Sequence, residues 1–583
     1  MVFQLEVLEV KMKEYKTVDG YHVYRIKKDK KFFFLADNLN YKKEINKLTE
    51  TLDDLKFDSL IFIFGIDTGE YLEDLKKSIC AKNKVVIFEP NKSIYEKFNP
   101  NIADNIKLLL FDKKNVKNIL NYSIYFENID NIYFYAFGDY SKIYKKEYDC
   151  LIEYLDWALI NASAHISLAK RFKKIFVQNM IANMKLLNEC TPIDHYMFTN
   201  LNVPAIIVSG GPSLDQNIKD MIQYKEKLKN CFIIAGSRTI AALIQNDIMP
   251  DMIVSIDPVD ANYDMMKDYL DLKVPFAFYE YSNRYLVKNY KGDKIYIPLL
   301  FSQTIETFSQ FKGVYSGGSV AHTCIDIANM LGCSPILFAG QDLAYTYGKH
   351  HADCTVYDYD KTLNYQSQIK VKDIYGEQVN SSLSLENYKK RLEQYIDAYK
   401  DKERIKFINC SYGAQIKGAP HQELNKIFQQ NIFHNKKNKC IPNKVINIDS
   451  QETVNNVLRY LEECIEKASQ GLELCEIIIE ENNNKSLVEI SDDDIDLQRI
   501  LYIIEIVNDF ENAPNSKYLG GYFTLFVFEM KNKIFLMYAK DYEKQTSDLL
   551  HQTKSFQIYF EKMKEMLVNV KKIIHRTVQE FYQ

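Results

Sequence analysis

Seven short apolar runs, separated by stretches with helical periodicity, constrain how the middle of this chain can fold. Strands that alternate with helices in this way form a mostly parallel sheet with helices on its faces. We therefore expect an α/β fold whose central domain contains a mostly parallel, Rossmann-like sheet. The runs are AIIVS (205–209), FIIA (232–235), DMIVSID (251–257), FAFYE (276–280), KIYIP (294–298), PILFAG (335–340) and KFIN (406–409).

The sequence on either side of this region predicts further domains, because 583 residues exceed one compact domain. SLIFIFGIDTGEYLEDLKKSI followed by KVVIFEP begins a second Rossmann-like β-α-β unit. A polar, proline-containing break, HNKKNKCIPNK, precedes a region of helical repeats. We predict an N-terminal Rossmann-like α/β domain (1–145), a helical connector (146–200), the central domain (201–433) and a mainly helical C-terminal domain (434–583).

The turn of the N-terminal unit has two interpretations. In a cofactor-binding version, Gly65 and Gly69 would let the backbone approach a ligand, and Glu89 would hold a pair of ribose hydroxyls. The turn has only two of the three glycines of the dinucleotide pattern, which favours a unit that is purely structural.

Charge and hydropathy exclude two classes of protein. The formal net charge of −4 provides no basic field for nucleic acid. No apolar run approaches the roughly 18 residues of a membrane helix, and the first residues carry charges where a signal peptide needs an apolar core. We expect a cytoplasmic protein with no nucleic-acid partner and no integral membrane segment.

The stretch IIVSGGPSLDQNI (206–218) carries the first candidate site. A strand ends near Ser209, Gly210 and Gly211 can turn several N–H groups toward one point, and Pro212 and Ser213 start a helix. An anion such as a nucleotide phosphate would meet these N–H groups and the positive end of the helix dipole. A tight turn that holds nothing is an equal alternative.

Two further strands deliver polar residues to the same edge of the predicted sheet. Ser237 and Arg238 follow one strand, and Asp257 follows the next. Asp257 could hold ribose hydroxyls, or a magnesium ion together with Asp260. The alternative is an Asx turn before a proline.

The segment 314–354 is the densest in candidate residues. A second glycine turn opens a helix predicted from Ser319 to Met330, and a strand then runs into a polar pair and a loop with aromatic and histidine side chains. His322 either lines the site or packs locally, and HHADC lacks the spacing of a metal site, so we predict no metal ligands. The candidates are Ser316, Gly317, Gly318, Ser319, His322, Gln341, Asp342, Tyr345, Tyr347 and His351, whereas we expect His350 to be a solvated loop residue.

Six segments, in order, carry a resemblance to a known family. They are SGGPSL, SIDP, YSGGSVAHTCIDIANMLGC, FAGQDLAYTYGKHHA, VKDIYGEQV and FINCSYGAQIKGA. Together they resemble the motility accessory factors, proteins implicated in attaching nonulosonic acids such as pseudaminic or legionaminic acid to flagellin. The core also resembles bacterial sialyltransferases with a G-N-G-P-S-L loop, which use a CMP-activated sugar and need no metal or other cofactor.

The resemblance implies a role for each group of residues. Residues 210–214 would bind the nucleotide phosphate, Ser237 and Asp257 would line the nucleotide pocket, and residues 316–319 would face cytidine or ribose. Tyr345 and Tyr347 would stabilise the leaving phosphate, and His351 would be the base toward the acceptor. This chain has Gly210 and Ser237 where the sialyltransferases have asparagine.

Three functions follow as hypotheses. The first is transfer of a nonulosonic acid from a CMP donor to Ser or Thr hydroxyls of flagellin. The second comes from archaeal hydroxymethylpterin diphosphokinases of the same superfamily, which use ATP and magnesium, with Asp257 and Asp342 as natural ligands. The third is a non-catalytic flagellin-binding chaperone. The large flanking domains suit a protein acceptor better than a pterin, which favours the transferase.

Overall fold

The computed structural model describes residues 12–98, 101–124, 128–299, 306–357, 369–399, 405–430, 432–481, 495–512 and 538–583. The chain divides into two compact units, each made of separate stretches. The first contains residues 1–171, 466–512 and 521–564, and the second contains residues 172–465, 513–520 and 565–583. The sequence predicted domains that follow one another along the chain, with boundaries at 145, 200 and 433. In the structure, the residues after 433 are divided between the two units.

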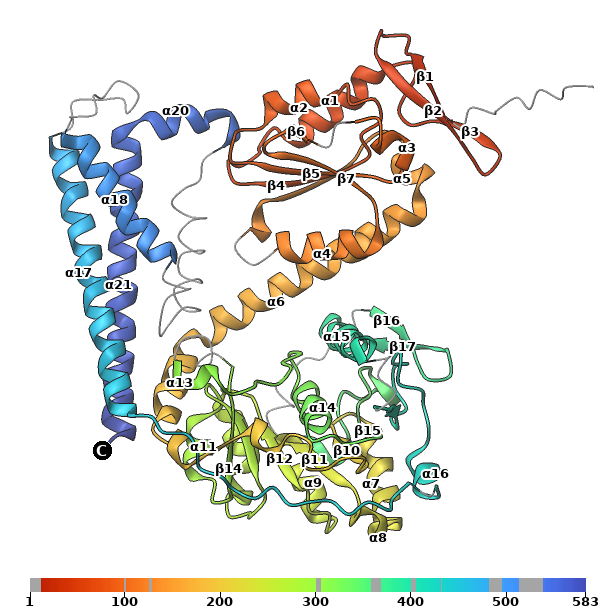
Figure 1. The fold of residues 1–583 in the computed structure, drawn as a ribbon, viewed down its shortest axis with the longest axis vertical. Coiled ribbons are helices and arrows are strands. Elements are labelled where there is room, and N and C mark those ends of the chain that lie inside the picture. Colours follow the sequence, from red (N-terminus) through yellow and green to blue (C-terminus); the bar gives the residue numbers. More distant parts are fainter. Residues whose placement is uncertain are drawn as a thin grey trace, which may run out of the picture. The chain divides into compact units, whose positions relative to one another are not determined.

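The second unit is built on an eight-stranded sheet in which every strand pairing is parallel (Figure 1). The strand order is β18-β15-β10-β11-β12-β13-β14-β9, so the connections reverse direction between β10 and β15. Such a switch point opens a crevice at the carboxyl ends of the strands. The strands are β9 (Thr191–Pro192), β10 (Ala205–Val208), β11 (Phe232–Gly236), β12 (Met252–Ser255), β13 (Phe276–Tyr279), β14 (Lys294–Ile297), β15 (Ile336–Ala339) and β18 (Phe407–Asn409).

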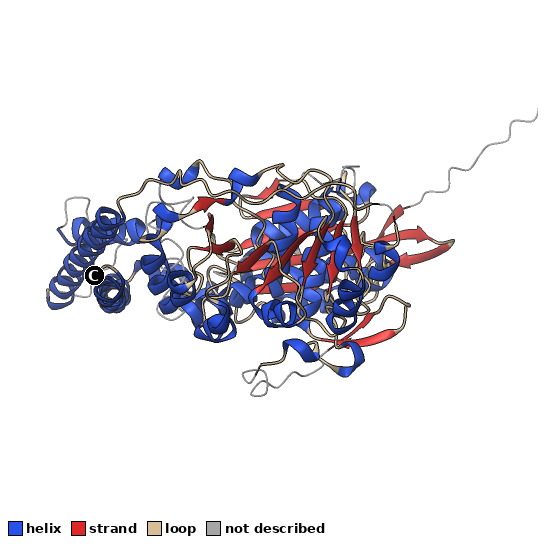
Figure 2. Ribbon diagram, turned by 90° about the horizontal axis from the view of Figure 1, so that it is seen from below, coloured by secondary structure: helices blue, strands red, loops and turns tan. Residues whose placement is uncertain are grey.

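Helices lie on both sides of the strands (Figure 2), with α14 and α15 on one face of this sheet and α7 and α9 on the other (Figure 1). Every residue of β10, β11, β12, β13 and β15 is buried, which explains why these strands are continuous apolar runs in the sequence. The predicted α/β fold with a central parallel sheet is confirmed. The helices are α7 (Leu214–Gln223), α8 (Lys225–Leu228), α9 (Ile240–Gln245), α10 (Asp260–Met266), α11 (Arg284–Asn289), α13 (Glu306–Ser309), α14 (Val320–Met330), α15 (Leu383–Tyr399) and α16 (Leu424–Phe428), and β16 (Ile369–Lys372) and β17 (Gln378–Ser381) form a hairpin.

The first unit contains a five-stranded sheet of order β6-β7-β5-β4-β8, in which only β6 runs antiparallel to its neighbour. An antiparallel three-stranded sheet, β1 (Met12–Lys16), β2 (His22–Lys28) and β3 (Lys31–Phe34), precedes it. The other elements are α1 (Tyr41–Thr51), β4 (Leu60–Phe64), α2 (Leu72–Ser78), β5 (Lys84–Glu89), α3 (Lys92–Tyr95), β6 (Asn101–Ala103), β7 (Ile106–Leu110), α4 (Lys113–Ser123), β8 (Ile132–Ala136) and α5 (Tyr140–Ile143).

Long helices complete the chain, as the absence of internal proline predicts. They are α6 (Lys145–Met184), α17 (Ser450–Glu480), α18 (Ile495–Asn512) and α21 (Leu549–Phe581), and the short helix α20 (Tyr542–Ser547) precedes α21. Within the first unit, a Cβ on Gly471 would lie 2.5 Å from the ring of Phe560, so this glycine permits close packing of α17 and α21. Ala539 joins the core of the N-terminal sheet, and its N–H donates to the carbonyl of Leu55 at 2.7 Å.

No helix in the described part of the chain combines the length and the apolar character that a membrane span requires.

Candidate functional site

The glycine loop after β10 leads directly into α7, and its last residue is held by a carboxylate from the turn after β15. The Ser213 N–H and hydroxyl donate to the two oxygens of Asp342, at 3.0 and 2.5 Å. Burial raises the pKa of the Asp342 carboxyl, and the hydrogen bonds from Ser213 oppose that rise. The negative group at the start of α7 is therefore a side chain of the protein itself.

Gly211 is required by the close approach of this loop to the end of β15. Its N–H donates to the Gly340 carbonyl at 2.8 Å, and a Cβ on Gly211 would lie 2.4 Å from Asp342 Oδ2. Asn217 of α7 accepts a hydrogen bond from the N–H of Gly340 at 2.9 Å. Gln341 is also buried, and its N–H donates to Ser411 Oγ at 2.6 Å. The β10 and β15 ends are thus joined by protein contacts.

The carbonyl oxygen of Gly210 is a shared contact point for the loop that follows β15. It accepts hydrogen bonds from the N–H of Ala352 at 3.1 Å and the hydroxyl of Thr355 at 3.2 Å. His351 Nδ1 lies 3.3 Å from the same oxygen. Because a carbonyl only accepts, Nδ1 must carry the proton in this bond, which assigns any base function of His351 to Nε2.

The aromatic residues of this loop divide into a packed set and an exposed one. The Tyr345 ring is buried and lies 5.3 Å from the His350 ring, which in turn lies 4.3 Å from the His351 ring. Tyr347 is instead exposed, in a left-handed backbone conformation. It borders a hollow of about 430 Å³ lined by Pro212, Asp215, Gln216, Lys219, Tyr347, Lys349 and Tyr412.

Two serine hydroxyls mark the neighbouring ends of β10 and β11. Val208 is paired with Ala235 across these strands, so Ser209 follows opposite Gly236 and Ser237 comes one residue later. Both hydroxyl oxygens are shielded from solvent and have no hydrogen-bond partner among the described residues. Such groups are uncommon in folded proteins and are candidates for ligand contacts.

The side chain of Arg238 also lies near the ends of β10 and β11, although the sequence analysis assigned it no role. Its Nη1 donates to the Thr355 carbonyl at 3.2 Å, and its guanidinium lies 5.6 Å from the centre of the Tyr357 ring. Asp257, one strand further, is exposed to solvent. Loss of hydration raises the pKa of Asp257, and the charge of Arg238 opposes this effect.

The second glycine turn lies beside the end of β11. Val320, the first residue of α14, would contact a Cβ on Gly236 at 3.0 Å. The helix begins after Ser319 and ends at Met330, as predicted. Ser316 and Gly318 are exposed, so this turn offers accessible groups next to Ser237.

His322 packs inside this turn. Its Nε2 lies 3.0 Å from the carbonyl of Tyr388, which as an acceptor requires the proton on Nε2. Burial lowers the pKa of His322 to about 4. A Cβ on Gly317 would lie 2.4 Å from the His322 ring, so Gly317 is needed to seat the imidazole. Of the two alternatives for His322, the structure places it in the core, as a neutral ring.

Comparison with known proteins extends over the whole chain. Residues 176–348 match the family model of MptE-like 6-hydroxymethylpterin diphosphokinases. A solved structure, the MAf glycosyltransferase from Magnetospirillum magneticum AMB-1, aligns with 99% of this chain and 93% of its own chain. The TM-score is 0.56 and the sequence identity is 12%. The chain therefore shares the fold of a MAf glycosyltransferase.

A search of curated protein sequences gives no significant match. The matched family region includes the glycine loop, Arg238, Asp257 and Asp342, and it ends before His350 and His351.

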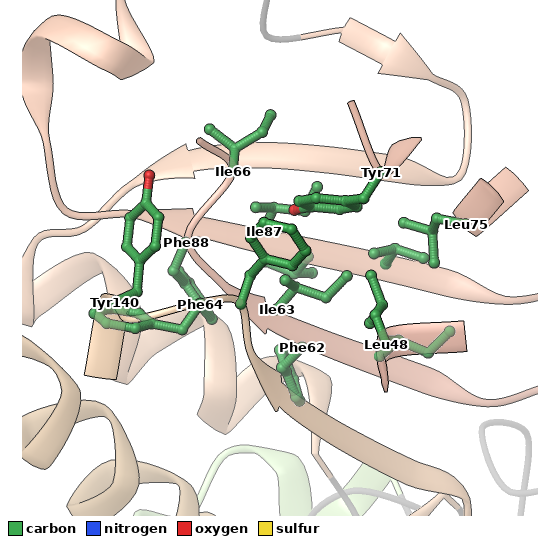
Figure 3. Close-up of a cluster of buried hydrophobic side chains, with 14 of the residues drawn as sticks. Leu48, Phe62, Ile63, Phe64, Ile66, Tyr71, Leu75, Ile87, Phe88 and Tyr140 are labelled. Carbon is green, nitrogen blue, oxygen red and sulfur yellow. The ribbon is translucent and has the colours of Figure 1, made fainter. Parts of the chain in front are cut away.

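The N-terminal unit has no open position where its glycine turn predicted a cofactor. A Cβ on Gly65 would lie 2.3 Å from the Tyr140 ring, which fills the space beside the turn (Figure 3). Glu89 is fully buried and accepts hydrogen bonds from Tyr140 Oη and the N–H groups of Ile66 and Asn91, at 2.8, 3.0 and 2.7 Å. These contacts leave Glu89 engaged with the protein, in agreement with the structural interpretation of this turn.

Two buried carboxyls in this unit titrate abnormally. Burial raises the pKa of Glu89 to about 7, and hydrogen bonds from the surrounding chain oppose the rise. Burial raises the pKa of Asp67 to about 8. Asp67 accepts from the Tyr24 N–H and from the Tyr41 hydroxyl, and its own N–H donates to Tyr140 Oη. Tyr140 thereby connects the two carboxyl residues inside the core.

Proposed function

We propose that this protein is a glycosyltransferase that moves a nonulosonic acid from a CMP-activated donor to Ser or Thr hydroxyls of flagellin, in the cytoplasm. The observation that carries the proposal is the extent of the likeness to a MAf glycosyltransferase. The diphosphokinase family matches only residues 176–348. The likeness to the MAf glycosyltransferase also includes the long parts of the chain on either side of these residues. A small pterin substrate gives no reason for such parts, whereas a protein acceptor does.

His351 is the proposed base. Its Nε2 removes the proton of the acceptor hydroxyl while the hydroxyl oxygen bonds to the anomeric carbon. The bond from that carbon to the donor phosphate oxygen breaks, and CMP leaves through a transition state with oxocarbenium character. The hydrogen bond from Nδ1 to the Gly210 carbonyl supports this role, because it fixes the required tautomer.

The remaining candidates would bind the donor. Ser209 and Ser237 supply hydroxyls at the strand ends, Asp257 suits ribose hydroxyls, and the exposed turn 316–319 suits the base or ribose. Tyr345 and Tyr347 are proposed to stabilise the leaving phosphate. No further cofactor is proposed.

The test is a transfer assay with purified protein, flagellin made without its glycosylation enzymes, and CMP-pseudaminic or CMP-legionaminic acid. We expect the intact mass of flagellin to increase by whole nonulosonic acid residues, with release of an equal amount of CMP. Addition of EDTA should not change the rate. Tight flagellin binding without CMP release would instead indicate a binding protein.

The family match favours one alternative, a diphosphokinase that uses ATP and magnesium. In that reaction Asp257 and Asp342 would be the natural metal ligands. Asp342 would first have to give up its hydrogen bonds to Ser213. AMP formation from ATP that requires both magnesium and 6-hydroxymethylpterin would overturn the transferase proposal.

A further inference from the structure

The polar groups of Ser213 at the start of α7 already have a hydrogen-bond partner within the protein. A helix N-terminus attracts anions because its N–H groups and dipole carry partial positive charge. Here Asp342 receives both the N–H and the hydroxyl of Ser213, and it is almost fully buried. A donor phosphate at this point would have to displace Asp342 from the Ser213 N–H and hydroxyl, so the phosphate needs a positive group elsewhere in the cleft.

Arg238 is placed to be that group. It follows β11, the strand next to β10, and its side chain crosses the glycine loop. A Cβ on Gly210 would lie 3.0 Å from Arg238 Cδ, so the absence of a side chain at Gly210 makes room for the arginine stem. Gly210 has no left-handed backbone requirement, which makes this contact the reason for glycine.

The guanidinium is oriented by the loop that carries the proposed base. Arg238 Nη1 donates to the Thr355 carbonyl, and the Tyr357 hydroxyl donates to the Arg238 carbonyl at 2.9 Å. The hydroxyl of Thr355 in turn donates to the carbonyl of Gly210, the oxygen that also contacts His351. Arg238 and His351 are therefore linked through Thr355 and the Gly210 carbonyl.

We propose that Arg238 binds the phosphate of the nucleotide donor, in place of the N-terminus of α7. The planar fork of a guanidinium matches two phosphate oxygens, and its permanent charge would stabilise the phosphate as it leaves the sugar. The proposal rests on the proposed function in one respect, namely that the cleft takes a nucleotide.

The test compares ligands that differ only in the phosphate. Calorimetry measures the Kd of CMP and of cytidine for the wild-type protein and for Arg238→Gln, Arg238→Lys and Gly210→Ala. Arg238→Gln should weaken CMP binding about tenfold or more, because a charged hydrogen-bond pair is lost, and should change cytidine binding less than twofold. Arg238→Lys should recover part of the CMP affinity. Gly210→Ala should weaken CMP binding by less than Arg238→Gln does, since the added methyl requires the arginine stem to shift by only a few tenths of an ångström.

Lys225→Gln is the matched control, because it removes an exposed positive charge from α8, which precedes the amino end of β11. It should leave both Kd values unchanged. Thermal unfolding of each variant checks that the fold is intact, and Arg238→Lys provides the second variant if Arg238→Gln does not fold.

The outcomes separate this inference from the proposed function. Equal losses for CMP and cytidine, or no loss for either, would overturn the role of Arg238 and leave the transferase proposal standing. If the wild-type protein binds AMP or ATP but not CMP, the transferase proposal fails, and the same comparison with adenosine decides the role of Arg238. Absence of binding to any of these nucleotides would overturn both.

Discussion

The carboxylate of Asp342 accepts hydrogen bonds from both the backbone N–H and the hydroxyl of Ser213, 129 residues earlier in the chain. These bonds join the turn after β15 to the start of α7 at the switch point of the sheet. The first turn of α7, where a phosphate could bind, is therefore occupied by Asp342. Further polar groups lie toward β11 and β12, at Arg238 and Asp257.

Asp342→Ala should destabilise this junction. The substitution removes the carboxylate that accepts hydrogen bonds from the buried N–H and hydroxyl of Ser213. This loss should lower the free energy of local opening by about 2–4 kcal/mol. Hydrogen exchange of the amides of α7 and β15 measures the loss. Asp342→Asn should lose about half as much, because its amide oxygen still accepts one bond. Asp268→Ala, at an exposed site, serves as the control and should stay within about 0.5 kcal/mol of wild type.

The stability of α14 should fall in acid because of His322. Its folded pKa of about 4 lies below the ordinary value of 6.5, so between these pH values the unfolded chain binds a proton that the folded chain does not. The contribution to stability is therefore present above pH 6.5 and decreases as pH falls toward 4, by roughly 3 kcal/mol. Hydrogen exchange of α14 amides at several pH values measures it.

His322→Asn, which keeps an N–H for the Tyr388 carbonyl but does not titrate, is the comparison. Its α14 amides should lack this pH dependence. Parallel profiles for the variant and the wild type would contradict the buried, neutral state of His322.

Glu89 should give the N-terminal unit the opposite pH dependence. Its folded pKa of about 7 lies above the ordinary value of 4.5, so in this range the folded chain holds a proton that the unfolded chain has lost. Stability therefore falls as pH rises from 4.5 to 7, by roughly 3 kcal/mol. Hydrogen exchange of β4 and β5 amides should show this fall in the wild type and a smaller one in Glu89→Gln. An equal fall in both proteins would assign the effect to another group, such as Asp67.

His351→Ala should lower the rate of sugar transfer by about a hundredfold or more while the Kd of CMP changes little, because a base acts on the acceptor hydroxyl and not on donor binding. Initial rates with saturating flagellin and calorimetry with CMP measure the two quantities. His350→Ala, the neighbouring substitution, should keep most of the activity. Wild-type turnover in His351→Ala would remove this residue from the base role.

The parallel sheet could be predicted because strands buried on both faces are continuous apolar runs, and all seven runs became strands. β9 was missed, since two residues of strand, Thr191 and Pro192, leave no periodic signal. The helix after Ser319 could be predicted to within a residue because a glycine turn begins it and Gly332 follows it.

The contacts of the site could not be predicted in the same way. That Asp342 would occupy the start of α7, and that Arg238 would cross Gly210, depends on which strand ends become neighbours and on how the loops between them pack. A sequence shows glycine at 65 and 210 but not what approaches it, which is the Tyr140 ring in one case and an arginine stem in the other.

The contact between Leu55 and Ala539 has a consequence for synthesis on the ribosome. The sheet of the first unit emerges early, yet part of its core comes from a residue near the end of the chain. At the usual rates of about 5–20 residues per second, roughly 25–100 s separate the appearance of the two residues. During that interval the nascent sheet lacks Ala539 from its core, and the Leu55 carbonyl lacks the N–H donor that this residue supplies.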